Sequence, residues 1–233
     1  MSETLTPNEL QRRHIQILGP DLGPVYDALY HECAWLHVKW HQYVQLFGTK
    51  PERLDLLNRS AGRFFQMVQD AFLDDTLLHL ARLTDHPGGG EKTNLSLRSL
   101  PALISDRKLR SETRALIKAA VDASAFAQDW RNRRIAHRDL ALKLDRPNVT
   151  PLAPASRKRI KDAIVALCRV IEHINSFYFG SGLRLSLITE TITQDAVSLL
   201  YVIRDGLNVE EQRRQRIRER KFLPSDLQPQ DEI

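Results

Sequence analysis

The sequence contains few of the residues that interrupt or cross-link a fold. Among 233 residues there are 10 Gly, 11 Pro and 2 Cys, and Cys33 lies far from Cys168 along the chain. The low glycine content excludes a collagen-like or low-complexity chain. Two cysteines so far apart in sequence give no sign of a disulfide framework. We therefore expect a protein of a reducing compartment whose fold depends on a hydrophobic core.

Long apolar runs are also missing. No stretch approaches the roughly 18 apolar residues that a membrane-spanning helix needs. The segment Met1–His14 lacks the apolar region of a secretory signal. Hydrophobic residues make up 42% of the chain and charged residues 27%, which is enough apolar material for a sizeable core. These features predict a soluble, cytoplasmic protein without a membrane partner.

Charge is spread unevenly along the chain. Residues 1–86 carry a net charge of −3 and residues 87–233 a net charge of +8, so a polyanion would be attracted to the second part. Two basic runs, at 157–161 and 213–221, have the charge to hold an RNA backbone, but neither contains an aromatic residue on which a base could stack. The alternative is that both runs are solvated helix ends.

Apolar residues recur at steps of three and four, the period of one helix face. This pattern predicts helices over 25–47, 57–83, 111–137, 156–178 and about 189–222, with a short segment at 97–104. The triple glycine after Pro87 and the proline-rich stretch at 145–154 predict loops. We therefore expect an all-α fold, a bundle of about five long antiparallel helices. The expected organisation is an N-terminal extension at 1–20, the bundle at 21–208, and a charged helix end and tail at 209–233.

The third of these helices ends in an unusual polar segment, Arg131–Asp139, which contains four arginines, an asparagine and a histidine. On an ideal helix, His137 continues the apolar face of Trp130, whereas Arg131 lies roughly 120° away from His137. If both act on one substrate, the helix must be distorted or a second subunit must supply the partner residue. Guanidinium groups at a helix end bind phosphate. Three of them are therefore predicted to bind substrate: Arg133, Arg134 and Arg138.

The stretch Arg131–His137, placed between two predicted helix pairs, resembles the motif of the HEPN superfamily, in which an arginine and a polar residue precede a histidine by a few positions. The stretch Leu77–Asp85 makes the resemblance closest to the abortive-infection U-type branch. The resemblance covers about residues 20–205 and implies a helical fold.

The resemblance further implies a metal-independent endoribonuclease that acts as a homodimer, with no cofactor. His137 would be the general acid or base at the ribose 2′-hydroxyl or the leaving oxygen. Arg131 would stabilise charge on the scissile phosphate, and Asn132 would position it. Such a protein would act on tRNA or mRNA as a toxin or phage-defence effector, held in check by an antitoxin or other regulatory protein.

Other interpretations of the same residues remain open. Many members of the superfamily are not nucleases and serve as dimerisation or nucleotide-binding modules. This chain would then bind a nucleotide, RNA or a protein without cleavage, and His137 would be a core histidine bonded to a carbonyl or to a carboxylate such as Asp75. Asp75, Arg82 and Asp85 form a polar end on the second predicted helix. Two interpretations of these residues stay open: they orient His137 or Arg131, or they form surface charge pairs, which is the interpretation that charged residues on a helix favour.

A metal site is a weaker hypothesis. His37 and His41 lie four residues apart, with His31 and Glu32 one to two turns earlier, which is a spacing that metal ligands use. No second helix offers a matching Glu-x-x-His or His-Glu-x-x-His pattern. The sequence therefore predicts no metal centre, and these residues are interpreted as the polar flank of a buried helix.

Overall fold

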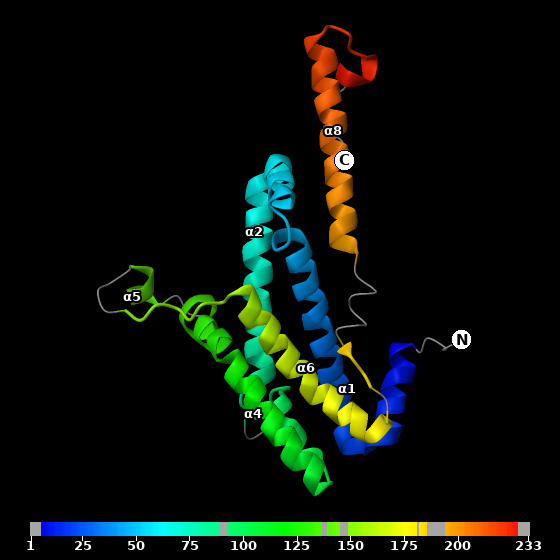
Figure 1. The fold of residues 1–233 in the computed structure, drawn as a ribbon, viewed down its shortest axis with the longest axis vertical. Coiled ribbons are helices and arrows are strands. Elements are labelled where there is room, and N and C mark those ends of the chain that lie inside the picture. Colours follow the sequence, from blue (N-terminus) through cyan, green and yellow to red (C-terminus); the bar gives the residue numbers. More distant parts are fainter. Residues whose placement is uncertain are drawn as a thin grey trace. The chain divides into compact units, whose positions relative to one another are not determined.

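The computed structural model describes residues 6–88, 93–136, 139–144, 149–180, 182–185 and 194–227. Within these residues the chain forms helices and no strand, so the predicted all-α fold is confirmed. Figure 1 shows their order: α1 Pro7–Phe47, α2 Pro51–Thr84, η1 Leu97–Ser99, α3 Leu100–Leu103, α4 Arg107–Trp130, η2 Arg131–Ile135, α5 Leu140–Lys143, α6 Arg157–Phe179, α8 Asp195–Arg218 and η3 Pro224–Leu227. Five of them, α1, α2, α4, α6 and α8, have 23 residues or more.

The helices form two compact units. Unit 1 contains residues 1–41 and 70–192, and unit 2 contains residues 42–69 and 193–233. Because α1 and α2 each continue from one unit into the other, the helical pattern of the sequence gives no sign of this division. Among the described residues, no helix is both long enough and apolar enough to cross a membrane.

The first helix starts earlier than the periodic pattern at 25–47 indicates, and it contains a break. Gly19 has a φ of 85°, a left-handed conformation that glycine adopts without steric penalty. The chain turns back there, so that the His14 Nδ1 atom lies 2.7 Å from a carboxylate oxygen of Asp27, with both side chains buried. Gly23 permits the close approach, because a Cβ atom at that position would lie 2.6 Å from the Cα atom of Ile15.

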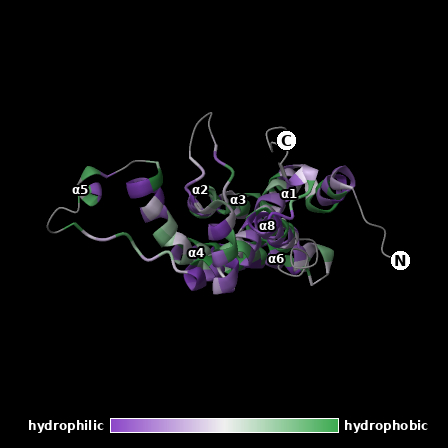
Figure 2. Cartoon of the chain, turned by 90° about the horizontal axis from the view of Figure 1, so that it is seen from above, coloured by the Kyte–Doolittle hydropathy of each residue, from purple (hydrophilic) through white to green (hydrophobic). Residues whose placement is uncertain are grey.

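Unit 1 is an antiparallel bundle. Glu32 of α1 lies beside His79 of α2. Two helical turns after Glu32, Lys39 of α1 contacts Asp75, which precedes His79 in α2. Helices α4 and α6 also lie side by side (Figures 1 and 2), and the Arg159 guanidinium stacks over the Phe126 ring. His173 near the end of α6 pairs with Glu112 near the start of α4, so the contacting residues run in opposite order and each pair of helices is antiparallel.

The sequence pattern is most accurate for α6. Its buried stripe contains Ile160, Ile164, Leu167, Cys168, Ile171 and Ile174, as predicted. The Ser156 hydroxyl caps the helix by accepting a hydrogen bond from the Arg159 backbone N–H, and Gly180 ends it with a φ of 62°. Cys168 and Cys33 are free and buried, which confirms both as core residues. In Figure 2 hydrophobic and hydrophilic stretches alternate along the helices, as this one-sided burial requires.

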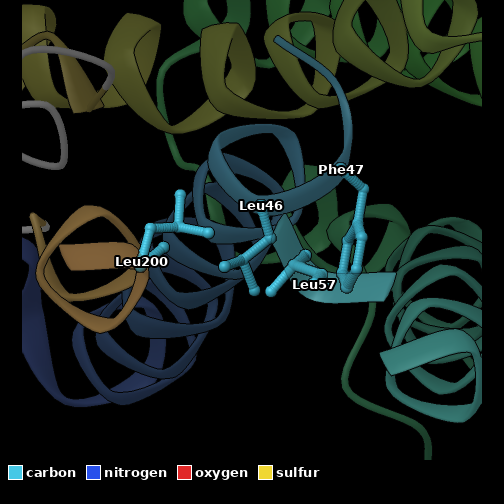
Figure 3. Close-up of a cluster of buried hydrophobic side chains, with 5 residues drawn as sticks. Leu46, Phe47, Leu57 and Leu200 are labelled. Atoms are coloured by element: carbon cyan, nitrogen blue, oxygen red, sulfur yellow. The ribbon is translucent and has the colours of Figure 1, made fainter. Parts of the chain in front are cut away.

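Unit 2 has a separate small core. Figure 3 shows Leu46 and Phe47 at the end of α1 packed with Leu57 of α2 and Leu200 of α8. The Gln42 amide oxygen accepts a hydrogen bond from the Ala196 N–H near the start of α8, at 3.0 Å. Ala196 is itself buried in this cluster, so the bond fixes the start of α8 against the end of α1.

Candidate functional site

The polar segment after α4 adopts a π-helical turn. The α-helix ends at Trp130, and over Arg131–Ile135 the Ala136 N–H donates to the Arg131 carbonyl, five residues earlier, at 2.9 Å. The regular helix expected as far as about His137 is therefore wrong over Arg131–Ile135, and the expected start at Ser111 is corrected to Arg107, where Asp106 caps the helix. A π-turn contains more residues per turn than an α-helix, so the ideal-helix spacing behind the expected angle of 120° does not hold over Arg131–Ile135.

Arg131 is held at the end of α2. Its Nη1 atom forms an ion pair with Asp85, and its Nε atom donates to the Asn132 side-chain oxygen at 3.0 Å. The side chains of Arg131 and Asp85 are each 26% exposed, so the pair is shielded from solvent without being buried. These two bonds engage Nη1 and Nε, and the Nη2 group is used by neither.

Gln128 joins the two helices that carry this ion pair. Its side-chain nitrogen donates to the Ala81 carbonyl at 2.9 Å and to Asp85 Oδ1 at 3.1 Å. The Ser96 hydroxyl donates to the Asp85 carbonyl at 2.6 Å. Asp85 is thus fixed by its main chain and its carboxylate, and Arg131 is fixed through Asp85. The sequence interpretation missed Gln128, although it precedes Arg131 by three residues and therefore lies near the same helix face.

Arg133 has a structural environment. Its guanidinium donates to the Thr150 carbonyl at 2.6 Å and to Asp129 at 3.3 Å, and it lies 3.7 Å from Asp139. Asp129 also accepts the Ala153 N–H at 3.0 Å. These contacts fasten the segment 149–153 to the end of α4, so Arg133 already has three internal partners.

Arg134 lies on a different part of the site. Its guanidinium carbon is 4.6 Å from the centre of the Trp130 ring, a cation–π arrangement. Together with Arg133 and Lys143 it lines a pocket of about 600 Å³. Asp70, Asp74 and Asp139 line the same pocket, so the positive charges there are matched by an equal number of carboxylates.

In the described part of the chain, no hydrogen bond or ion pair joins the remaining predicted residues to Arg131. His137 and Arg138 lie outside the described residues. Asp75 is paired with Lys39, and Arg82 is exposed and lines a pocket of about 310 Å³ together with Glu32 and Asp85. The structure therefore brings Asp85, Asn132 and Arg131 together, whereas the described contact of the Asp75 carboxylate is with α1.

His79 is a buried histidine beneath this polar end. Its Nε2 atom lies 2.6 Å from a carboxylate oxygen of Glu32. Burial lowers the pKa of His79 to about 4, and the positive charge of Lys39 acts in the same direction, against the opposing effect of Glu32. At neutral pH this imidazole is therefore uncharged.

The histidines of α1 do not form a recognisable metal centre. Among the described residues, no group of three or more His, Cys, Asp or Glu side chains is arranged to hold a metal ion. His31 lies 3.7 Å from Asp27, and Glu32 lies beside His79.

Comparison with known proteins agrees with the helical fold. Residues 20–199, most of the chain, match the family model HEPN_AbiU2, described as AbiU2. Searches of curated proteins and of solved structures gave no significant match. The matched range includes α4, the π-helical turn and Asp85. The chain therefore belongs to the HEPN_AbiU2 family of abortive-infection U2 domains.

Proposed function

We propose that this protein is a metal-independent endoribonuclease of the HEPN type that acts as a homodimer in abortive infection. The observation that carries the proposal is the π-helical turn at Arg131–Ile135. Such turns are rare in helices and frequent at functional sites. Here the turn coincides with the motif that resembles the HEPN signature, and its first residue is fixed by Asp85.

Arg131 is suited to stabilise a phosphate in the transition state. Its ion pair with Asp85 fixes the direction of the guanidinium, and the Nη2 group is not used by the bonds to Asp85 and Asn132. A fixed donor stabilises developing negative charge better than a mobile one because it needs no reorganisation during the reaction. Asn132, which is exposed, would contact a non-bridging oxygen of the same phosphate through its amide nitrogen.

His137 would transfer the proton. In the proposed reaction the ribose 2′-oxygen attacks the adjacent phosphorus, the P–O5′ bond breaks, and the products are a 2′,3′-cyclic phosphate and a 5′-hydroxyl. One proton leaves the 2′-hydroxyl and one is added to the 5′-oxygen, so the reaction uses a base and an acid. Each chain has one such motif, and a homodimer would supply two histidines. An antitoxin or other regulatory protein would control the activity.

The first test compares the wild type with His137→Ala on total cellular RNA and on tRNA in excess EDTA. We expect cleavage by the wild type, with cyclic phosphate ends, and a loss of at least 100-fold in the variant. His86→Ala is the matched control, because His86 is an exposed histidine of unit 1 outside the motif. Equal cleavage by His137→Ala would contradict the proposal. Saturable RNA or nucleotide binding without cleavage would favour the non-catalytic alternative.

A second test concerns Asp85 as a positioning residue. Asp85→Asn keeps an oxygen that can accept from Gln128 but removes the charge that holds Arg131. We expect kcat to fall about tenfold with KM nearly unchanged, since the bond matters for the orientation of Arg131 in the transition state. Asp75→Asn is the matched control, as its described partner is Lys39. A purely structural role for Asp85 would lower the melting temperature and leave kcat of the folded enzyme intact.

The dimer is testable by sedimentation velocity at micromolar concentration. We expect a particle of twice the 26.8 kDa chain mass. A strict monomer that cleaves RNA would contradict the two-histidine arrangement.

A further inference from the structure

A third pocket of unit 1 is lined by none of the residues of the arginine-rich turn. It has a volume of about 420 Å³ and is formed by η1 and α3 on one side and the first half of α4 on the other. Aliphatic side chains, including Pro101, Ile117 and Val121, contribute to its lining. Three cations complete the lining: Arg98, Arg114 and Lys118. We call it the α4 basic pocket.

The three cations of the α4 basic pocket have no acidic neighbour in its lining. Among the described residues, no carboxylate lines the pocket. In the part of the chain that the structure describes, no ion pair involves Arg98, Arg114 or Lys118. The nearest acidic residue along α4 beyond Lys118 is Asp122, which is exposed. This pocket therefore differs from the one beside the π-helical turn, where carboxylates match the positive charges.

It also differs from the two basic runs that the sequence draws attention to. In the run at 213–221, Arg213 and Arg216 bind Asp226, and Arg214 binds Glu210. In the run at 157–161, Lys158 is paired with Asp162. Neighbouring carboxylates thus satisfy much of the charge of the run at 213–221 and the charge of Lys158 in the run at 157–161, which weakens the attraction of these cations for a polyanion.

The cations of the α4 basic pocket are held on well-defined backbone. Arg114 and Lys118 are four residues apart on α4, so they lie on one face with a rise of about 6 Å between them. Arg98 comes from η1, whose first turn is capped by the Ser96 hydroxyl, with the Arg98 N–H donating at 3.3 Å. Ser96 is fully buried. Charged groups on fixed elements lose less conformational entropy when they bind a ligand.

We propose that the α4 basic pocket binds backbone phosphates of an RNA strand, as a contact separate from the arginine-rich turn. Phosphate is the expected ligand because guanidinium and ammonium groups pair with it strongly. The lining offers no aromatic ring for stacking and no neutral polar side chain that would recognise a base. Binding should therefore be independent of sequence. This inference rests on the proposed function for its choice of RNA as the polyanion.

The pocket and the arginine-rich turn are separated both along α4 and around it. Lys118 and Arg131 are thirteen residues apart, which corresponds to about 20 Å along the helix axis and to about 140° around it. A strand that contacts both places would have to curve around α4, and the distant contact would contribute affinity without taking part in the reaction.

The test measures binding of a labelled 2′-O-methyl oligonucleotide of about twelve residues, a length within the range that single-strand binding sites cover. The methyl group blocks attack by the 2′-oxygen, so binding is observed without cleavage. The pocket variant is Arg114→Gln with Lys118→Gln. The matched control is Arg12→Gln with Arg169→Gln, which removes the same charge from exposed positions of α1 and α6 in the same unit.

We expect the pocket variant to bind about tenfold more weakly and the control to bind like the wild type. The slope of log K against log salt concentration should become shallower by about 1.4 in the pocket variant, since each lost phosphate contact changes it by about 0.7 for a single strand. Equal weakening in both variants, or none in either, would overturn the proposal. Displacement of the strand from the wild type by micromolar mononucleotide would also overturn it, because the pocket would then be a free-nucleotide site.

The proposal and the nuclease function can fail separately. If the wild type binds RNA through the pocket but cleaves none, the nuclease proposal fails and the binding site stands. If RNA is cleaved in a His137-dependent manner but the pocket variant binds and cleaves normally, the pocket proposal fails.

Discussion

At the scale of single residues, the stability of unit 1 depends on two glycines, one at the break in α1 and one at a close backbone approach, and on two buried histidines. Gly19 reverses the chain direction within α1. Gly23 lets the helical segment before this break, at Ile15, pack closely against the segment after it. Buried histidines add a different constraint. His14 and His79 are almost fully buried, and burial lowers the pKa of each.

We expect Gly23→Ala to lower the free energy of unfolding by about 1–3 kcal/mol, the range for overpacking a fixed site. The new methyl group would lie 2.6 Å from the Ile15 Cα atom, and backbone moves less easily than a side chain. Gly206→Ala is the control, because open space surrounds Gly206 in α8 and alanine favours a helix. Urea denaturation measures both. If Gly23→Ala were as stable as the wild type, the backbone at Ile15 would be able to move away from the new methyl group without cost, which would contradict this prediction.

Stability should fall as the pH drops from about 6.5 towards 4. In this range the unfolded chain protonates the imidazole of His79, whereas the folded protein keeps it neutral until the pH reaches its pKa of about 4. Between pH 7 and about pH 5 this effect amounts to about 2 kcal/mol. Glu32 and Lys39 from α1, and Arg82 from α2, are the charges that influence this group.

Urea denaturation of His79→Leu tests this explanation. The loss of stability between the two pH values should be smaller in the variant, and the remainder should reflect His14, whose lowered pKa acts in the same direction. An unchanged pH dependence would assign the effect to other groups.

At the scale of elements, the end of α4 organises its surroundings. Asp129 and Arg133 bind the backbone of the segment 149–153, and the Trp130 indole N–H donates to the Ala153 carbonyl at 2.6 Å. The π-helical turn that follows is therefore held on two sides, by this segment and by Asp85, which comes directly after α2. A turn with an unusual hydrogen-bond pattern persists when its neighbours fix it.

Trp130→Phe should release the segment 149–153 while leaving α4 intact. Phenylalanine keeps a ring for Arg134 to stack on but removes the indole N–H donor, a loss of about 1 kcal/mol. Hydrogen exchange should become faster at 149–156 and stay the same in α6. Trp35→Phe serves as the control because Trp35 is 58% exposed. Unchanged exchange at the segment would mean that Asp129 and Arg133 suffice to hold it.

At the scale of the whole molecule, the chain contains two cores that share two long helices. The core of unit 1 includes the inner faces of α1, α4 and α6, and the core of unit 2 includes Leu46, Leu57 and Leu200. Units with separate cores can unfold separately, since the packing of one does not depend on the side chains of the other.

Leu200→Ala should destabilise unit 2 by about 2–5 kcal/mol, the range for truncating a buried leucine. Hydrogen exchange should become faster in residues 42–69 and 194–227 and remain unchanged in unit 1. Val202→Ala, at a position 70% exposed on the same helix, should change neither. Faster exchange throughout α4 and α6 would show that the two units unfold as one.

The sequence by itself determined the helical fold class, the stripe and both ends of α6, and the location of the motif. These depend on local properties: a 3.6-residue period of apolar side chains, a serine cap and a glycine that adopts positive φ. The HEPN resemblance depended on residue types at short spacing, which are also local. The break at Gly19 and the early start of α4 at Asp106 were missed because many turn and capping residues occur in sequences without forming either feature.

Only the tertiary structure decided what the charged residues contact. In sequence, Asp75, Arg82 and Asp85 were equivalent candidates, but packing of α2 against α4 placed Asp85 on Arg131, while Asp75 contacts Lys39. The same packing gave Arg133 internal partners and left Arg114 and Lys118 without a described ion pair at an open pocket. The division into two units was likewise decided by packing, because α1 and α2 pass through both. Contacts between distant segments depend on how helix faces meet, and no local pattern in the sequence encodes which charge will meet which.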